Sequence, residues 1–415
     1  MNTTAPTQTK PYAILVISLC ACYLFYKYVL QIYPSIITQP LMQIFQLTAT
    51  DLGYLAATFY YTYTLMQIFT GVLIDKYGAR WLSSFAIFCC AVGAILFANA
   101  THLPLAIFAR GLMGFGVAFA TVSYMRVAAA WFPPKHYAFV SGLLATAAMG
   151  GAVFGQAPLS FAVGLFGWRT CLLMVGIFGV ILALLFLIFL KEAPATTDHV
   201  VPEHEQFSWQ HVVQVLKSKQ NWLLTLYNGL AFSPVVIFGG LWGNPFLEKA
   251  YHLTHTEIAS MVSLIFIGLG LGSPLLGLVS DYFEERRNVM LISTLVGFAA
   301  ISAILYCHAL PIWLLASLLF LFGFSLGSFM LVFTIGKELN PAFLIATVVA
   351  MINTSEPILN GITEPIIGKV LDLTWDGTIQ NGSHSFTLQS YHLALSILPA
   401  YLLIASLLLL FVKRK

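Results

Sequence analysis

The chain has 415 residues, of which 8% are charged and 59% are hydrophobic, and its formal net charge is +3. Its mean hydropathy is +0.87. Soluble domains carry about 25% charged residues, so this chain has too few polar groups to cover a surface in water. The composition excludes an ordinary soluble protein and indicates one whose solvent is largely lipid.

Twelve apolar stretches can be distinguished, each long enough to cross the hydrocarbon core of a bilayer as a helix. Backbone polar groups in lipid must be paired within each segment, which excludes open sheets. We therefore predict an all-α membrane protein with twelve transmembrane helices in two pseudo-symmetric six-helix bundles. The predicted spans are residues 12–36, 50–74, 81–98, 104–131, 137–163, 168–190, 222–247, 256–279, 288–307, 311–336, 343–371 and 391–412.

The only long polar interruption near the middle divides these spans into two groups of six. Part of it, residues 207–219, has apolar residues on one helical face and lysines toward water, which predicts an interfacial helix. Three histidines of this linker, His199, His204 and His211, have no apparent fourth ligand, so we expect no metal site. The predicted parts are a cytoplasmic N-terminus (1–11), a first bundle (12–190), a linker (191–221), a second bundle (222–412) and a basic tail (413–415).

The basic residues predict the orientation. If both chain ends are cytoplasmic, 13 of the 19 lysines and arginines fall in cytoplasmic segments, which is a strong positive-inside bias. Arg169, Lys249 and Lys369 fall in outer segments, and three more basic residues lie inside helices. The 13 are Lys10, Lys76, Arg80, Lys135, Lys191, Lys217, Lys219, Arg286, Arg287, Lys337, Lys413, Arg414 and Lys415.

A short acidic and basic turn occurs once in each half of the chain. The segment 71–80 reappears in degraded form at 277–286, and both Gly71 to Gly277 and Asp75 to Asp281 are 206 residues apart. A repeat of about half the chain length, between apolar runs, is most typical of secondary transporters. The residues that define the turn are Gly71, Asp75, Lys76, Gly78 and Arg80 in the first half, and Gly277, Asp281 and Arg286 in the second.

The first turn resembles the signature loop between helices 2 and 3 of the major facilitator superfamily. All the signature positions match except the one occupied by Ala79. Further motifs that resemble the family are Arg110–Gly116, Trp131–Pro133 and Gly167–Arg169. The resemblance implies that Asp75 is a gate, whose contact with a neighbouring helix N-terminus forms when the protein faces outward and breaks when it opens inward. The alternative is a solvated turn that only fixes topology.

Two shorter motifs, Met66–Ile68 and Leu241–Pro245, resemble bacterial relatives of the lysosomal dipeptide transporters and the phagosomal amino-acid transporters of intracellular bacteria. This resemblance implies an amino acid or short peptide as the solute. In helix 5, the glycine spacing of the family's antiporters is followed by Gln156 in place of proline. That departure argues against antiport and favours import or facilitated diffusion.

Ionisable residues well inside transmembrane helices cost about 2.5 to 3.5 kcal/mol each, so they are candidates for a polar cavity. Lys27 and Gln31 are four residues apart and share one helical face. Arg126 shares a face with Ser123 and either binds solute or braces the signature loop. Arg110 matches a family arginine linked to coupling or substrate contact, and the alternative is that it packs against helix 1.

Polar residues in helix 11 form the clearest pattern. Asn353, Glu356, Asn360 and Glu364 are spaced by three, four and four residues, so they lie along one stripe of a helix. In lipid such a stripe faces either a wet cavity or a neighbouring helix, where it would serve as interhelical hydrogen bonding. We expect a cavity role for Glu356 above all.

Two further groups of residues form either a ligand wall or ordinary packing. They are Tyr60, Tyr63 and Gln67 in helix 2, and Asn228, Trp242 and Asn244 in helix 7.

The cations of the first half and the acids of the second would suit a zwitterion. We therefore predict a secondary active or facilitative transporter of an amino acid or short peptide, working by alternating access, with a proton on Glu356 or Glu364 as the coupling ion. The alternative within transport is an organic-anion, siderophore or drug carrier, for which Lys27 and Arg126 alone would suffice. A polytopic membrane enzyme would need a cluster of nucleophile, base or metal ligands, which the sequence lacks.

The sequence contains no lysine-bearing phosphate loop, so ATP is not expected to drive transport, and no cofactor is predicted. The expected partners are a small-molecule solute, protons and the lipid bilayer, with no nucleic acid. We expect a monomer that spans a bacterial inner membrane many times, with both termini cytoplasmic.

Overall fold

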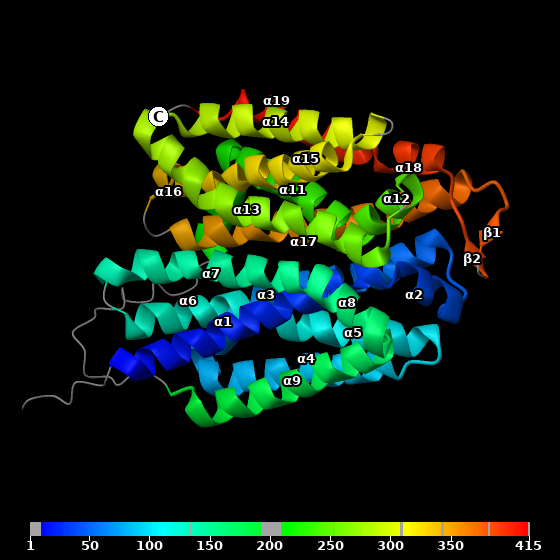
Figure 1. Cartoon of the computed structure of the whole chain (residues 1–415). Coiled ribbons are helices and arrows are strands. Elements are labelled where there is room, and N and C mark those ends of the chain that lie inside the picture. The colour runs from blue at the N-terminus through cyan, green and yellow to red at the C-terminus, as the bar shows by residue number, and fades with distance from the viewer. Residues whose placement is uncertain are drawn as a thin grey trace, which may run out of the picture.

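The protein is a layered assembly of helices in two bundles, one above the other in Figure 1. The computed structural model describes residues 10–132, 134–191, 209–251, 253–307, 310–341, 344–380 and 382–413. Within them the chain is helical apart from one two-stranded antiparallel hairpin. The prediction of an all-α membrane fold is confirmed.

The first half of the chain forms the lower bundle of Figure 1. Its helices are α1 (Lys10–Ile32), η1 (Tyr33–Ile36), α2 (Thr38–Phe45), α3 (Ala49–Tyr77), α4 (Ala79–Ala98), α5 (Leu103–Val117), α6 (Ala120–Trp131), α7 (Pro134–Phe154), α8 (Ala157–Phe166) and α9 (Trp168–Phe189).

The second half forms the upper bundle and is preceded by the short helix α10 (Trp209–Lys217), within the segment expected to be an interfacial helix. Its helices are α11 (Lys219–Ile237), η2 (Phe238–Trp242), α12 (Gly243–Ala250), α13 (His255–Phe283), α14 (Arg286–Tyr306), α15 (Ile312–Leu326), η3 (Gly327–Met330), α16 (Leu331–Leu339), α17 (Ile345–Leu373), α18 (Leu388–Leu395) and α19 (Ile397–Leu409). The strands β1 (Ile379–Gln380) and β2 (Ser383–His384) lie between α17 and α18.

Ten helical stretches among the described residues are long and apolar enough to cross a membrane. The other two expected spans are α3 and α17, which have 29 residues each. At 1.5 Å per residue each is about 43 Å long, enough to cross the hydrocarbon core. These two helices pack against each other between the bundles. Protein therefore covers part of their more polar surface.

The internal repeat extends from sequence to structure. α3 runs from residue 49 to 77 and α13 from 255 to 283, so both ends are 206 residues apart. Each helix begins with a capping box, Thr48 with Asp51 in one half and Thr254 with Glu257 in the other. In each, the threonine hydroxyl oxygen accepts a hydrogen bond from the N–H of the acid, and the carboxylate of the acid accepts one from the threonine N–H. The duplicated unit thus carries its own helix-start signal.

The two bundles meet along two helix pairs. α3 packs on α17, while α7 and α8 pack on α13. Glycine permits the close crossing of α3 and α17, because a Cβ at Gly53 would lie 2.6 Å from the backbone oxygen of Glu364. We call the end of the molecule that carries β1 and β2 the hairpin end, and the opposite end, where α1 begins and α19 finishes, the linker end (Figure 1).

Several predicted spans are interrupted. The fourth span is divided into α5 and α6, the fifth into α7 and α8 at Gly155–Gln156, and the tenth by η3. In the seventh span the irregular turn is η2, a π-helical turn between α11 and α12. The short helix α2 and the hairpin were not predicted. Hydropathy detects apolar length but is insensitive to local changes in backbone hydrogen bonding, which explains these differences.

Candidate functional site

A buried lysine of the first bundle lies where the two bundles meet. Lys27 on α1 is 6% exposed, and its Nζ donates a hydrogen bond of 3.3 Å to the Tyr63 hydroxyl on α3. The same Nζ lies 4.6 Å from the ring centre of Tyr63 and 5.2 Å from that of Tyr28. Glu356 of the second bundle interacts electrostatically with it. Lys27, Tyr63 and Glu356 are thus brought together from both halves, as a solute site requires.

The polar stripe of α17 contributes the opposing side. Asn360 Nδ2 donates a hydrogen bond of 2.5 Å to Glu356 Oε1. The Oδ1 atom of Asn360 is buried with no hydrogen-bond partner among the described residues. Asn353 is half-buried on the same helix. The stripe therefore offers both an acidic group and an unused acceptor next to Lys27.

Glu364, further along α17, is 1% exposed. Its Oε2 atom has no hydrogen-bond partner in the described part of the chain. Arg110 and Glu356 interact with it electrostatically, as does Tyr60. The Tyr60 hydroxyl is hydrogen-bonded to the Gln31 side chain. These residues form a second buried polar group beside the first.

Arg110 is committed to helix packing. Its Nη1 donates a 2.5 Å hydrogen bond to the Leu30 carbonyl, and its Nη2 donates one of 3.3 Å to the Gln31 carbonyl. The guanidinium lies 4.4 Å from the ring centre of Phe59 and 5.4 Å from that of Tyr33. Arg110 thus packs against the first helix, while its Nε has no hydrogen-bond partner among the described residues.

The remaining candidates of the first half differ in their surroundings. Gln67 on α3 is half-buried, and its Oε1 is buried without a partner in the residues described. Arg126 on α6 is half-buried and takes part in an interaction of its own. Gln67 therefore remains available for a solute, like Asn360.

The candidates of the predicted seventh helix have packing contacts. Asn228 Nδ2 donates to the Ile352 carbonyl and to Ser355 Oγ, both at 3.1 Å, and so joins α11 to α17. Asn244 donates to Gln156 Oε1 at 3.1 Å, at the hairpin end. Trp242 is buried, and its Nε1 has no partner among the described residues. These contacts resemble interhelical hydrogen bonding more than a ligand wall.

The signature turn of the first half lies at the linker end, where α3 ends at Tyr77. Gly78 has φ +80°, a conformation that favours glycine. Lys76 is exposed, and Arg80 Nε donates 2.7 Å to the Leu187 carbonyl within the same bundle. Gly71 has open space around it, and the side chain of Asp75 lies outside the described residues. The predicted gating contact of Asp75 stays a prediction.

The second copy of the turn is an ion-pair network. Arg286 donates to Asp281 and to Glu338, each at 2.8 Å, and thereby links α13, α14 and α16. Gly277, like Gly71, has open space around it. All three charged residues belong to the second bundle, so this network braces one half.

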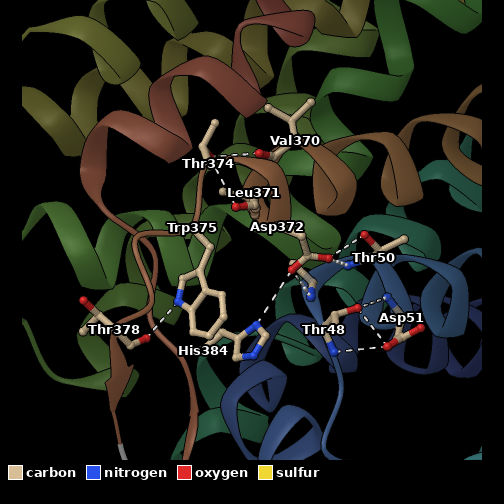
Figure 2. Close-up of polar contacts among 11 residues, drawn as sticks. Thr48, Thr50, Asp51, Val370, Leu371, Asp372, Thr374, Trp375, Thr378 and His384 are labelled. Atoms are coloured by element: carbon tan, nitrogen blue, oxygen red, sulfur yellow. Dashed lines mark hydrogen bonds and ion pairs between the residues drawn. The ribbon is translucent and has the colours of Figure 1, made fainter.

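Sequence reasoning missed the polar contacts between the bundles at the hairpin end. Gln156 Nε2 donates to the Gly239 carbonyl of the second bundle at 2.5 Å, and also to Ser35 Oγ of its own bundle at 2.9 Å. On the other side, the Asp372 carboxylate accepts hydrogen bonds from the start of α3 (Figure 2). The change from proline to Gln156 was the only sequence signal for the first contact. An acid at the end of α17 gave no indication of its partner.

A helical membrane protein with two packed bundles and a buried polar site between them has the architecture of a solute transporter. A family model described as Major Facilitator Superfamily matches residues 19–362, and the chain belongs to this superfamily. It is thus a membrane transporter of small solutes.

Three of the similar transporters come from Bacillus subtilis and Escherichia coli. An uncharacterized transporter of Bacillus subtilis, YybO, is 23% identical over 83% of this chain and 84% of its own length. A hexuronate transporter of Bacillus subtilis is 27% identical over 62% of this chain and 65% of its own length. A probable galactarate/D-glucarate transporter of Escherichia coli, GarP, is 24% identical over 63% of this chain and 66% of its own.

Solved structures share the fold. A bacterial homolog of the human lysosomal transporter Spinster, solved in an inward-facing and unoccupied conformation, superimposes with a TM-score of 0.80 over 97% of both chains, at 16% identity. The nucleoside transporter NupG, solved as a mutant, gives a TM-score of 0.74 over 96% of this chain and 99% of its own, also at 16% identity. Both confirm the major facilitator fold.

Proposed function

We propose that this protein carries a small organic anion of the sugar-acid class across a bacterial inner membrane by alternating access. Two of the similar transporters are named for hexuronate and for galactarate/D-glucarate. These names favour the organic-anion alternative over the amino-acid and dipeptide prediction. The short motifs that suggested the latter, Met66–Ile68 and Leu241–Pro245, are largely apolar and drift easily between branches.

The observation that carries the proposal is the environment of Lys27. A buried ammonium requires charged or hydrogen-bonding partners. Among the described residues its hydrogen-bond partner is the neutral Tyr63 hydroxyl. A solute carboxylate would give Lys27 a charge-assisted hydrogen bond, which is stronger than one to a neutral group.

Arg110 is a poorer candidate for the same role. Two of its nitrogens already donate to the backbone of α1. Only its Nε has no hydrogen-bond partner among the described residues. Lys27 is therefore the cation that we propose for the solute, because its amine makes a single hydrogen bond among those residues, to a neutral hydroxyl, and has donor capacity left over.

The hydroxyl groups of a sugar acid need both donors and acceptors. Glu356 and the unused Oδ1 of Asn360 supply acceptors from the second bundle, and the unused Oε1 of Gln67 supplies one from the first. A solute held in this way contacts both halves at once. Such contact lets solute binding influence whether the hairpin end or the linker end of the protein is open.

The orientation of the protein in the membrane follows from charge. We propose that the linker end is cytoplasmic, because it collects the basic residues of the sequence. The hairpin end then faces outward. We further propose that a proton on Glu356 couples uptake to the proton gradient.

The test is uptake by the purified protein in proteoliposomes. Labelled glucuronate should accumulate, and excess glucarate or galactarate should compete, whereas alanine and dialanine should not. Competition by alanine or dialanine alone would restore the zwitterion reading, in which Glu356 holds the ammonium group.

The same assay tests Lys27. Lys27→Met should raise KM for glucuronate at least about tenfold, because the charged partner of the carboxylate is lost. Lys369→Met, an exposed lysine on α17, is the matched control and should leave KM unchanged. A Lys27→Met protein with wild-type KM would exclude this role.

A further inference from the structure

We propose that Asp372 is the gating residue of the hairpin end. Its carboxylate, at the end of α17 in the second bundle, caps the first turn of α3 in the first bundle (Figure 2). The Ala49 N–H donates to Oδ1 at 2.9 Å, and the Thr50 N–H donates to Oδ2 at 2.8 Å. The Thr50 hydroxyl donates to the same Oδ2 at 2.5 Å.

The N-terminus of α3 is capped by both halves of the protein. The first turn of a helix leaves its N–H groups without partners inside the helix. The Thr48 hydroxyl oxygen accepts a hydrogen bond from the N–H of Asp51. The Asp372 carboxylate accepts hydrogen bonds from the N–H groups of Ala49 and Thr50. The helix therefore keeps its own cap whether or not Asp372 is present. What Asp372 adds is a charged link between the bundles, favoured by the helix dipole.

This link is reversible in water. If the bundles separate at the hairpin end, the two N–H groups of α3 and the carboxylate become hydrated, and none is left buried without a partner. Such a contact adds to the stability of the closed end without making opening prohibitive. These are the properties that a gate requires.

The hairpin lies next to Asp372. His384 on β2 has its Nδ1 3.9 Å from Asp372 Oδ1. The His384 ring stacks on Trp375, with ring centres 3.8 Å apart and planes 15° from parallel. Trp375 Nε1 in turn donates 2.9 Å to the Thr378 carbonyl (Figure 2). The segment after α17 thus places an imidazole ring, held by stacking on Trp375, close to the carboxylate.

The position of the contact explains why it gates. α3 carries Tyr63 and Gln67, and α17 carries Glu356 and Asn360. Close to Asp372, α3 and α17 are in tight contact, since a Cβ at Gly368 would collide with the Ala49 backbone. Opening of this end requires α3 and α17 to part there. The inference rests on the alternating access proposed above, although it does not depend on which solute is carried.

The experiment measures access from the hairpin end. Ile32 is 1% exposed, and its side chain lies 3.5 Å from a Cβ placed on Gly240 of the other bundle. An Ile32→Cys reporter should therefore react slowly with a membrane-impermeant maleimide added outside right-side-out vesicles. The labelling of the chain's own cysteines is subtracted by using the protein without the reporter.

In this background Asp372→Ala should raise the labelling rate about tenfold, because the open population grows when the charged contact is lost. Thr50→Val, which removes only the hydroxyl contact, should give a smaller rise. Thr50→Val also keeps the test valid if Asp372→Ala fails to fold.

Asp376→Asn is the matched control. This acid lies on the loop that follows α17, close in sequence to Asp372. The Thr378 hydroxyl and N–H hold the pKa of its carboxyl below the usual range, so it also carries a charge. Its hydrogen bond is to Thr378 within the loop, at 2.9 Å. The Asp376→Asn protein should be labelled at the same rate as the protein that carries only the Ile32→Cys reporter. If folded Asp372→Ala and Thr50→Val proteins label no faster than Asp376→Asn, the gating role is wrong.

This readout separates two kinds of failure. If glucuronate is not a solute but Asp372→Ala still increases labelling, the proposed solute is wrong and the gate stands. If glucuronate is transported and labelling does not change, the gate is wrong and the solute stands.

Discussion

Arg110 on α5 holds the backbone of α1 through a 2.5 Å hydrogen bond to the Leu30 carbonyl. Lys27 lies three residues before Leu30 on the same helix. The arginine that resembles a family coupling residue therefore fixes the helix that carries the solute-binding candidate. Its effect on transport is expected to be indirect.

Arg110→Lys should lower the stability of the protein by about 2 to 3 kcal/mol, because a lysine cannot reproduce two hydrogen bonds and the ring stacking of a guanidinium. Thermal unfolding in detergent measures the loss. Arg169→Lys is the matched control, since Arg169 also donates to a carbonyl, that of Ala100, and stacks on Trp168, but is only half-buried. If Arg110→Lys unfolds at the wild-type temperature but has a raised KM for glucuronate, Arg110 would instead belong to the solute site.

Glu356→Gln should abolish uphill uptake and leave exchange of solute intact. The amide keeps the size of the carboxyl and can still accept the hydrogen bond from Asn360, but it cannot take up and release a proton. Accumulation driven by an imposed pH gradient is compared with counterflow in the same proteoliposomes. Glu285→Gln, an exposed acid near the linker end, is the control and should behave as wild type. Accumulation by Glu356→Gln that still follows the pH gradient would show that another group carries the proton.

How far the sequence predicts this fold depends on the kind of information needed. Apolar length alone predicts the helices, because lipid leaves the backbone no other way to pair its polar groups. The periodicity of α17 correctly places Glu356 and Asn360 together, since residues four apart share a face. Both inferences are local to a single helix.

Pairings between helices were beyond such reasoning. Asn228 was considered as part of a ligand wall, yet it joins α11 to α17. A polar residue in an apolar helix serves a cavity or a neighbouring helix equally well, and only the packing decides. For the same reason no pattern connected Asp372 with Thr50, more than 300 residues away.

Gln156 should close the hairpin end on the side away from Asp372. Its side chain joins the start of α8 in the first bundle, where Gln156 is the N-cap residue, to η2 of the second, through the 2.5 Å hydrogen bond to the Gly239 carbonyl. Its Oε1 accepts a hydrogen bond from Asn244. Gln156→Leu keeps a similar volume and removes these two bonds between the bundles, together with the bond to Ser35 in the first bundle. It should therefore raise labelling of the Ile32→Cys reporter several-fold. Gln380→Leu, on the exposed strand β1, is the control.

The double variant gives the stronger test. Asp372 and Gln156 lie on different helix pairs, so their effects on one closed-to-open equilibrium should add in free energy and multiply in labelling rate. The Gln156→Leu and Asp372→Ala double variant should therefore label at about the product of the two single enhancements. A double variant that labels no faster than the faster single one would mean that the two contacts do not act on a common opening. In that case Gln156 would serve local packing around Ser35, and Asp372 alone would control access from this end.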